Sequence, residues 1–193
     1  MARLPDVDLT ANPDTAEVFE RVAASRGWVS NLMKSLAHAP EGLARYSALG
    51  HYVRYGSELT EVQRELAIVA TVRGVEYGWV HHSGLARQIG VTEAQLDDIR
   101  QGRAPADLGP AERALCDFVF ALTALRGVPD GVLGTLRGHF TPRQIVDIAM
   151  LSAYYMAAGT LILGLGVELE PPEVLQIELD WQKKTMGEAN REG

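Results

Sequence analysis

Residues 76–82 read EYGWVHH, which places two imidazoles, a phenol, an indole and a carboxylate within about two turns of a predicted helix. Imidazole has an unperturbed pKa near neutrality, so His81 or His82 could act as an acid or a base after a small shift. The pair could instead bind a metal ion. It could also be structural, with one ring hydrogen-bonded in the core and the other exposed.

Helix signals surround this stretch. Thr60 and Gln63 form a capping-box pattern before a helix at 61–73, and Thr141, Pro142 and Gln144 open a long apolar helix in the same way. The other helices that we predict cover residues 16–25, 29–37, 40–56, 79–89, 94–101, 111–125 and 131–140. No stretch alternates as a strand would, so the predicted fold class is all-α.

The predicted domain organisation is simple. We expect an N-terminal lead at 1–13, one helical domain at 14–170 and a C-terminal arm at 171–193. A break between Gly74 and Gly78 should separate the helix at 61–73 from the next one. The arm follows Pro171 and has weak periodicity, so we expect it either to pack on a partner subunit through Trp181 or to fray.

Composition narrows the function classes. Hydrophobic residues make up 47% of the chain and charged residues 22%, with a formal net charge of -7, as in a soluble, mildly acidic protein. This charge argues against nucleic acid and anionic membranes as partners. The segment from Ile145 to Val167 is long and apolar, but Asp147, Ser152 and several small residues dilute it, so we interpret it as a buried helix. Residues 1–6 show no export signal, which makes the cytoplasm the expected location.

A metal site is disfavoured by spacing. His81 and His82 point about 100 degrees apart on one helix, and neither has a histidine or carboxylate four residues away. The single cysteine, Cys116, excludes an intrachain disulfide and a multi-thiolate site, and we expect it to be buried and inert. The spacing therefore makes a metal site the minority interpretation of the histidine pair.

The acid/base hypothesis needs a group that orients an imidazole, and Glu65 is the best candidate. It lies beside Leu66 and Ile68 on the preceding predicted helix, where an inward carboxylate would need a partner. If the two helices form a hairpin, Glu65 could approach His82 or His81. The alternative is that Glu65 faces solvent or pairs with Arg73.

Three stretches, 64–68, 76–82 and 85–90, resemble the carboxymuconolactone decarboxylase and alkylhydroperoxidase D-like superfamily. Residues 141–147, 154–155 and 165–169 resemble the closing helix of that family, so the resemblance spans roughly 59–170. It implies an all-helical bundle that assembles as a homotrimer, or as a homohexamer built from trimers.

In the peroxidase branch a C-x-x-C motif precedes a relay histidine, and a glutamate one helix earlier joins the relay. Here the cysteine positions fall on Val75 and Gly78, while His82 matches the histidine and Glu65 the glutamate. Without those thiols, disulfide-forming peroxide reduction is not expected. The spacing from Glu65 to the motif is also shorter than in the family, and Gly78 replaces an acidic residue common among thiol-free members.

The motif residues other than the thiols resemble the decarboxylase branch of the family. This resemblance implies a lyase or isomerase that acts on a small carboxylated, cyclic metabolite without a cofactor. Such chemistry needs a proton donor and a group that stabilises an enolate. The resemblance makes His82 the principal acid/base and Glu65 its orienting group, with His81 and Tyr77 as auxiliary donors. Trp79 and Tyr154 are the expected substrate contacts. The alternatives are a thiol peroxidase and a non-catalytic binding or scaffold protein.

Overall fold

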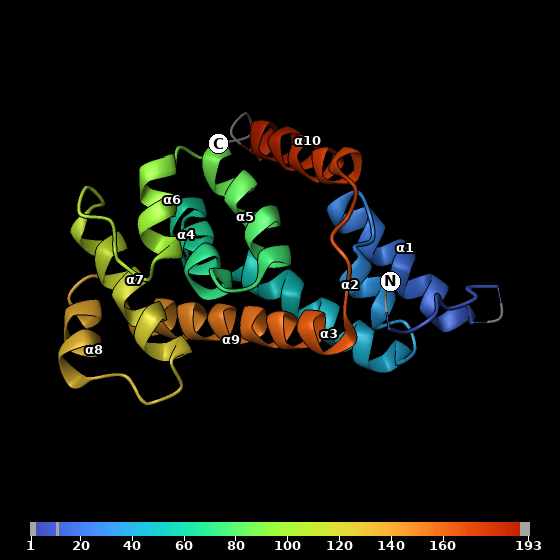
Figure 1. The fold of residues 1–193 in the computed structure, drawn as a ribbon, viewed down its shortest axis with the longest axis horizontal. Coiled ribbons are helices and arrows are strands. Elements are labelled where there is room, and N and C mark those ends of the chain that lie inside the picture. Colours follow the sequence, from blue (N-terminus) through green and yellow to red (C-terminus); the bar gives the residue numbers. More distant parts are fainter. Residues whose placement is uncertain (1–2, 11, 190–193) are drawn as a thin grey trace. The chain divides into compact units, whose positions relative to one another are not determined.

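The chain is described by a computed structural model that covers residues 3–10 and 12–189, and within those ranges every regular element is a helix (Figure 1). The helices are α1 (Pro13–Arg26), α2 (Asn31–Ser35), α3 (Pro40–His51), α4 (Glu61–Val72), α5 (Glu76–Gln88), α6 (Glu93–Arg100), α7 (Pro110–Thr123), α8 (Asp130–Arg137), α9 (Pro142–Leu165) and α10 (Pro172–Ala189), with a π-helical turn η1 (Tyr52–Gly56) after α3. The predicted all-α fold class is confirmed.

By their contacts the described residues form two compact units. One comprises the residues up to Leu49 together with those from Leu161 onward, and the other comprises Gly50–Thr160. The first unit has its own apolar core, in which Val18 and Val22 of α1 pack with Met33 and Leu43.

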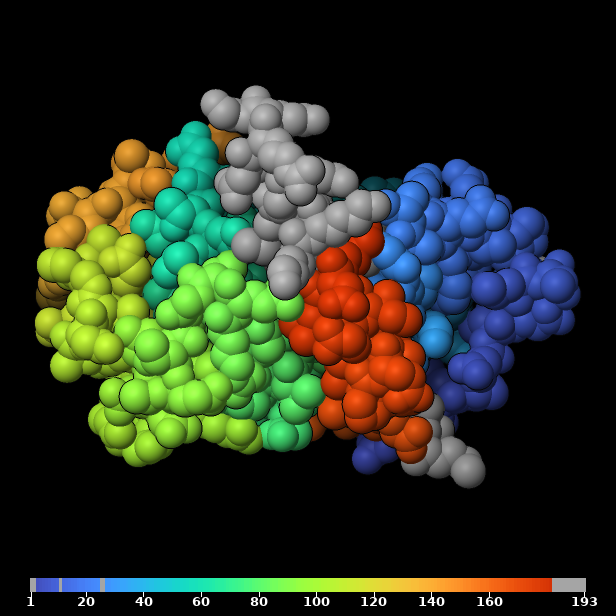
Figure 2. Space-filling model, turned by 90° about the horizontal axis from the view of Figure 1, so that it is seen from above, coloured from blue at the N-terminus to red at the C-terminus, as the bar shows by residue number. Residues whose placement is uncertain are grey.

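The second unit is built around α4, which packs on α5, α6 and α7, while α7 also packs on α8 (Figure 1). Successive residues of α4 are fully buried, namely Glu65, Leu66, Ala67, Ile68, Val69 and Ala70. A helical segment that is buried on all sides is apolar all round, and residues 66–70 of α4 fit this rule, with Glu65 as the one buried charged residue of the helix. Figure 2 shows part of the surface that α6 and α7 present, coloured from green to yellow.

The predicted capping boxes are confirmed. The Thr60 side chain accepts a hydrogen bond from the Gln63 N–H, and the Gln63 side chain accepts one from the Thr60 N–H. Thr141 and Gln144 make the same reciprocal pair before α9, which begins at Pro142. These bonds satisfy backbone N–H groups that have no partner within the helix, and so fix where α4 and α9 begin.

The predicted break between the two helices exists, but it ends before Gly78, because α5 begins at Glu76 and not at the predicted residue 79. A Cβ atom on Gly78 would lie 2.9 Å from the Val72 Cβ, so this glycine allows α5 to approach the end of α4 closely. A glycine inside a helix can thus allow a neighbouring helix to pack closely, although glycine in the sequence usually indicates that a helix ends.

Two further predictions needed correction. The third predicted helix does not continue regularly to Gly56, since α3 ends at His51 and η1 follows. The predicted arm forms α10, with Pro172 in its first turn. Trp181 packs on α1 of its own chain, since a Cβ on Gly27 would lie 2.6 Å from Trp181 Cδ1. Residues 190–193 of the predicted arm lie outside the described residues.

Helix α9 is long and apolar enough to cross a membrane, and it is the one candidate among the described residues. Of its most apolar 18-residue window, 44% is buried inside the protein. The core helix of a soluble protein meets the same criterion, and the buried Asp147 near its start has hydrogen-bond partners. The interpretation of α9 as a buried helix stays a prediction.

Candidate active site

Glu65 of α4 and His82 of α5 meet in the interior of the second unit. The two helices form a hairpin, and His82 Nδ1 lies 2.9 Å from Glu65 Oε2. Of the alternatives that the sequence left open, the structure shows Glu65 bonded to His82 and not facing solvent, despite the short spacing along the sequence. Glu65 is 0% exposed and His82 is 6% exposed.

The hydrogen bond determines what each ring nitrogen of His82 can do. A carboxylate only accepts hydrogen bonds, so Nδ1 carries the proton that it donates to Glu65. In the neutral imidazole, Nε2 is then the acceptor and the atom at which a proton can be gained or lost. The same arrangement orients the histidine of a catalytic triad.

Glu65 stays ionised although it is fully buried. Burial acts to raise the pKa of its carboxyl group, but the charge and hydrogen bond of His82, together with the positive charges of Arg54 and Arg64, lower the pKa below its ordinary value. The carboxylate can therefore stabilise a positive charge on His82 when the ring takes up a proton.

Two buried oxygen atoms close to this region have no hydrogen-bond partner among the described residues. One is Glu65 Oε1, and the other is Ser152 Oγ on α9. Ser152 lies one turn before Tyr155, which contacts His82. Buried polar atoms are nearly always hydrogen-bonded, so unsatisfied ones mark places where a polar guest would be favoured.

Tyr155 is the tyrosine of α9 that reaches His82. Its ring meets the His82 ring edge to face, with centroids 4.8 Å apart, while Tyr154 packs against Tyr155 at 5.3 Å. Sequence reasoning selected Tyr154 as a substrate contact, a role that stays a prediction. The periodicity of an apolar helix does not reveal which of two adjacent tyrosines faces a given neighbour.

His81 and Tyr77 form a second aromatic pair on α5. Their ring centroids lie 4.6 Å apart, as expected for residues one turn apart, and His81 is buried. The pair occupies a neighbouring face of α5, because adjacent residues of a helix point about 100 degrees apart. Their role as auxiliary donors stays a prediction.

Trp79 anchors α5 to α6. The guanidinium of Arg100 lies 4.8 Å from the centroid of the buried indole, and Arg100 also pairs with Glu76 in the first turn of α5 at 2.5 Å. The indole thus takes part in a cation–π contact between two helices. Its predicted role as a substrate contact remains untested.

Val75 and Gly78, which align with the thiol positions of the peroxidase branch, take part in close packing between helices. Val75 fits against Gly159, where a Cβ would lie 3.0 Å from Val75 Cγ2, and Gly78 fits against Val72. Cys116 on α7 is fully buried, and this burial, with the charges of Asp117 and Glu112, raises the pKa of its thiol to about 12. The predicted inert state of Cys116 is supported, since a thiol is nucleophilic only when ionised.

Sequence reasoning missed Arg54, Tyr52 and the importance of Asp147. Arg54 lies in η1 and is 4% exposed, and its charge acts on Glu65. Tyr52 donates a hydrogen bond to Asp147 Oδ1 at 2.8 Å. A charged residue in an apolar helix was the available signal, since a buried carboxylate requires partners.

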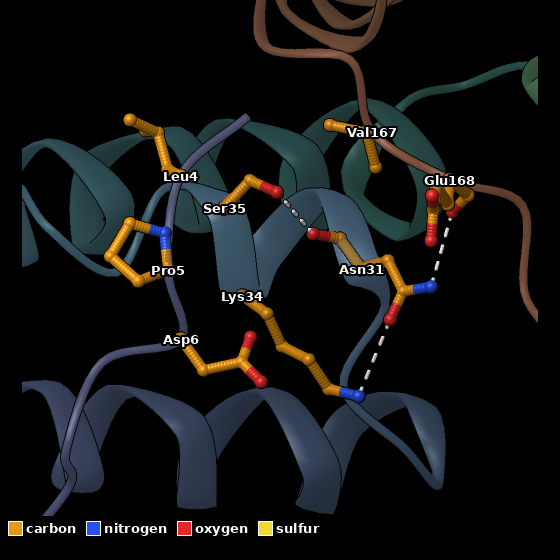
Figure 3. A pocket seen from close by; sticks show the side chains of 8 residues that line it. All are labelled: Leu4, Pro5, Asp6, Asn31, Lys34, Ser35, Val167 and Glu168. Carbon is orange, nitrogen blue, oxygen red and sulfur yellow. Dashed lines mark hydrogen bonds between the residues drawn. The ribbon is translucent and has the colours of Figure 1, made fainter. Parts of the chain in front are cut away.

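One cavity lies away from these residues. It has a volume of about 230 Å³ and belongs to the first unit, and no predicted site residue lines it (Figure 3). Lys34 and Asn31 on one side are joined by a hydrogen bond, and Asp6 and Glu168 add carboxylates. In the described ranges, no three His, Cys, Asp or Glu side chains come together as metal ligands.

Residues 40–121 match the family model described as the carboxymuconolactone decarboxylase family. No curated protein matches the chain by sequence. Among solved structures, an uncharacterised peroxidase-related protein from Ralstonia eutropha with an alkylhydroperoxidase D core is similar over 92% of this chain and 96% of its own, with a TM-score of 0.76 and 24% identity.

Two further solved structures share the fold. A peroxidase-related protein from Silicibacter sp. TM1040 has a TM-score of 0.73 at 22% identity, with coverage of 88% of this chain and 92% of its own. A debrominase has a TM-score of 0.70 at 17% identity, with coverage of 91% and 95%. At these identities the structural likeness establishes the fold alone.

Proposed function

We propose that this chain, whose residues 40–121 belong to the carboxymuconolactone decarboxylase and alkylhydroperoxidase D-like superfamily, is a cofactor-independent acid/base enzyme acting on a small carboxylated cyclic metabolite. The reaction is a decarboxylation or a related lyase or isomerase step. The buried hydrogen bond between His82 and Glu65 carries the proposal. It would hold one imidazole nitrogen ready to exchange a proton next to a charge that stabilises the protonated ring.

Decarboxylation would proceed in two steps at this site. The bond to the carboxylate breaks, carbon dioxide leaves, and the electron pair moves into a conjugated carbonyl of the substrate to form an enolate. His82 Nε2 then delivers a proton to carbon and regains one from solvent, while Glu65 stabilises the imidazolium before the transfer. In an isomerisation, neutral His82 would remove a proton from one carbon and return it to another.

A thiol peroxidase is the weaker enzymatic alternative. Val75 and Gly78 stand at the thiol positions, and Cys116 lies buried on another helix with a raised pKa. The peroxidase-related and debrominase structures share the fold, but proteins of one fold can catalyse different reactions. A non-catalytic scaffold is the alternative from another class, and no cleavage or isomerisation of any cyclic acid by the pure protein would favour it.

The proposed function comes with expectations for the location, the oligomeric state and the partners of the enzyme. We expect a cytoplasmic homotrimer or homohexamer with a small carboxylate or lactone as its partner, and neither nucleic acid nor membrane. Size-exclusion chromatography with light scattering would distinguish a monomer from these assemblies.

The test is a screen of small cyclic lactone acids, followed by variants on the best substrate. Replacing His82 with alanine should lower kcat by roughly 10²–10⁴. His139→Ala is the matched control, since that imidazole is exposed and lies two residues beyond the end of α8. An unchanged rate in the His82 variant would remove it from the proposed role, and peroxide turnover with a dithiol that survives Cys116→Ser would contradict any thiol route through that residue.

A further inference from the structure

The cavity of the first unit is enclosed by three segments that lie far apart in the sequence (Figure 3). The N-terminal segment contributes residues 4–6, α2 contributes three residues, and the connection after α9 contributes residues 167–168. Its volume of about 230 Å³ lies below the roughly 300–1,000 Å³ of the pockets that hold drug-sized ligands. The cavity therefore suits a small guest.

Hydrogen bonds hold these three segments against one another. Arg3 donates two hydrogen bonds to the last carbonyl groups of α9, at 3.2 and 3.0 Å, which ties the N-terminal segment to the end of that helix. Asn31 Nδ2 donates to the Glu168 carbonyl at 3.1 Å, and the Asn31 N–H donates to Glu170 Oε1 at 2.6 Å. The walls are thus in place before any guest arrives, which lowers the entropy cost of binding one.

The N-terminal wall is anchored at both of its ends. Gly166 follows α9 in the left-handed region, with a φ of 62°, and a Cβ there would lie 3.0 Å from Arg3 Cγ. This glycine therefore lets the arginine approach the helix end closely. The Pro5 carbonyl accepts a hydrogen bond from His38 Nε2 at 2.9 Å. Asp6 directly follows this anchored residue and lines the cavity.

Two opposite charges line the cavity without pairing with each other. Lys34 and Asp6 both belong to the lining, and no ion pair joins their side chains in the part of the chain that the structure describes. The Lys34 ammonium has three donors, and its one hydrogen bond to a described residue, Asn31 Oδ1, is long at 3.4 Å. The Asp6 carboxylate accepts no hydrogen bond from the described residues. Both charges are therefore available to a guest.

We propose that this cavity binds a small zwitterion, a molecule such as an amino acid that carries one ammonium and one carboxylate group. The carboxylate of the guest accepts from Lys34 and its ammonium donates to Asp6, so that both hydrogen bonds are charge-assisted. A guest with a single charge would pair with one of these side chains and be repelled by the other. Leu4, Pro5 and Val167 supply apolar contacts for its carbon atoms.

This binding site does not rest on the proposed function, because no residue of the proposed acid/base site lines the cavity. The competing explanation is that the cavity holds only solvent and that Lys34 and Asp6 are ordinary exposed charges. In that case a zwitterion would bind no better than a molecule with one charge.

The experiment measures Kd by saturation-transfer NMR titrations of the full chain at neutral pH and constant ionic strength. The probes are glycine, β-alanine and 4-aminobutyrate, each compared with the acid that lacks the amino group and the amine that lacks the carboxylate. At least one zwitterion should bind at least about threefold more tightly than both of its analogues, the order expected for one solvent-exposed ion pair. The amine is the stricter comparison, because Glu168 adds a second carboxylate to the lining.

Variants assign the binding to the two charges. Asp6→Asn and Lys34→Gln should each weaken binding of that zwitterion by about threefold or more. Asp14→Asn and Arg126→Gln, which remove exposed charges outside the cavity, are the matched controls and should leave Kd unchanged. The charge exchange Asp6→Lys with Lys34→Asp should bind the zwitterion more tightly than Asp6→Lys or Lys34→Asp alone, since the guest can bind in the reverse orientation. Far-ultraviolet circular dichroism establishes that each variant is folded.

The outcomes decide between the two explanations. Zwitterion binding that requires both side chains and persists in His82→Ala supports the inference, whether or not any cyclic acid is turned over. A wild type that binds no zwitterion more tightly than its analogues overturns it, as does a folded Asp6→Asn or Lys34→Gln protein with the wild-type Kd. A charge exchange that binds no better than the single charge reversals also overturns it.

Discussion

Replacing Glu65 with glutamine should lower the free energy of unfolding at pH 7 by about 1.5–3 kcal/mol, the range for a buried hydrogen bond to a charged group. The estimate follows from a fully buried carboxylate at 2.9 Å from a nearly buried imidazole. Glutamine keeps the shape and an acceptor oxygen, so the loss should stay below the roughly 3–5 kcal/mol typical of removing one partner of a buried pair outright.

The difference in stability between the wild type and Glu65→Gln should depend on pH. The pKa of Glu65 in the folded protein lies below its ordinary value of 4.5, so its contribution to stability is fully present above about pH 4.5 and is lost as the pH falls through the lowered pKa. Glutamine does not titrate. The difference between the two proteins should therefore shrink as the pH falls below 4.5.

Urea denaturation of both proteins at a series of pH values measures this difference directly. Glu93→Gln is the control, because Glu93 pairs with Arg87 at an exposed position where solvent screens the interaction, so a small effect is expected. A Glu65→Gln protein that is as stable as the wild type at pH 7, or a difference that does not change between pH 7 and the acid limit, would refute the reasoning.

Three other perturbations test the packing around the site. Gly78→Ala should destabilise the protein by about 1–3 kcal/mol through its clash with Val72, and Val72→Ala in the same chain should recover part of the loss, as urea midpoints of the double-mutant cycle will reveal. Cys116 should react with a thiol reagent at pH 8 only as fast as the protein opens, since its pKa is about 12, and rapid labelling of the folded chain would contradict its inert state. Tyr52→Phe should lower the free energy of unfolding by about 1–3 kcal/mol, because Asp147 Oδ1 loses its donor while buried, and an unchanged urea midpoint would show that this hydrogen bond does not stabilise the fold.

Local signals in the sequence were sufficient for much of the fold. Thr60 and Thr141 mark helix starts because capping depends on residues three positions apart, which a sequence displays directly. That Glu65 needs a partner was also predictable, since it stands among apolar residues, but the sequence left His82, His81 and Arg73 open as candidates, and the structure brings it to His82.

Features that depend on distant residues were not predictable in this way. Gly78 indicates a helix break in the sequence, and only its close contact with Val72 in the folded chain explains why a glycine lies inside α5. The hydrogen bond between Tyr52 and Asp147 joins residues 95 positions apart in the sequence. The choice between Tyr154 and Tyr155 depends on the rotation of α9 about its axis, which an apolar pattern on all sides leaves undetermined.

The central claim is that Glu65 holds neutral His82 with the proton on Nδ1 and leaves Nε2 for proton exchange. Nitrogen-15 NMR of the imidazole side chains, with His82 assigned by its loss in His82→Gln, measures that tautomer directly. The account predicts that in the neutral state His82 carries its proton on Nδ1 in the wild type, and that Glu65→Gln shifts the population toward the Nε2–H form. A wild-type His82 with its proton on Nε2, or a tautomer that does not respond to Glu65→Gln, would contradict it.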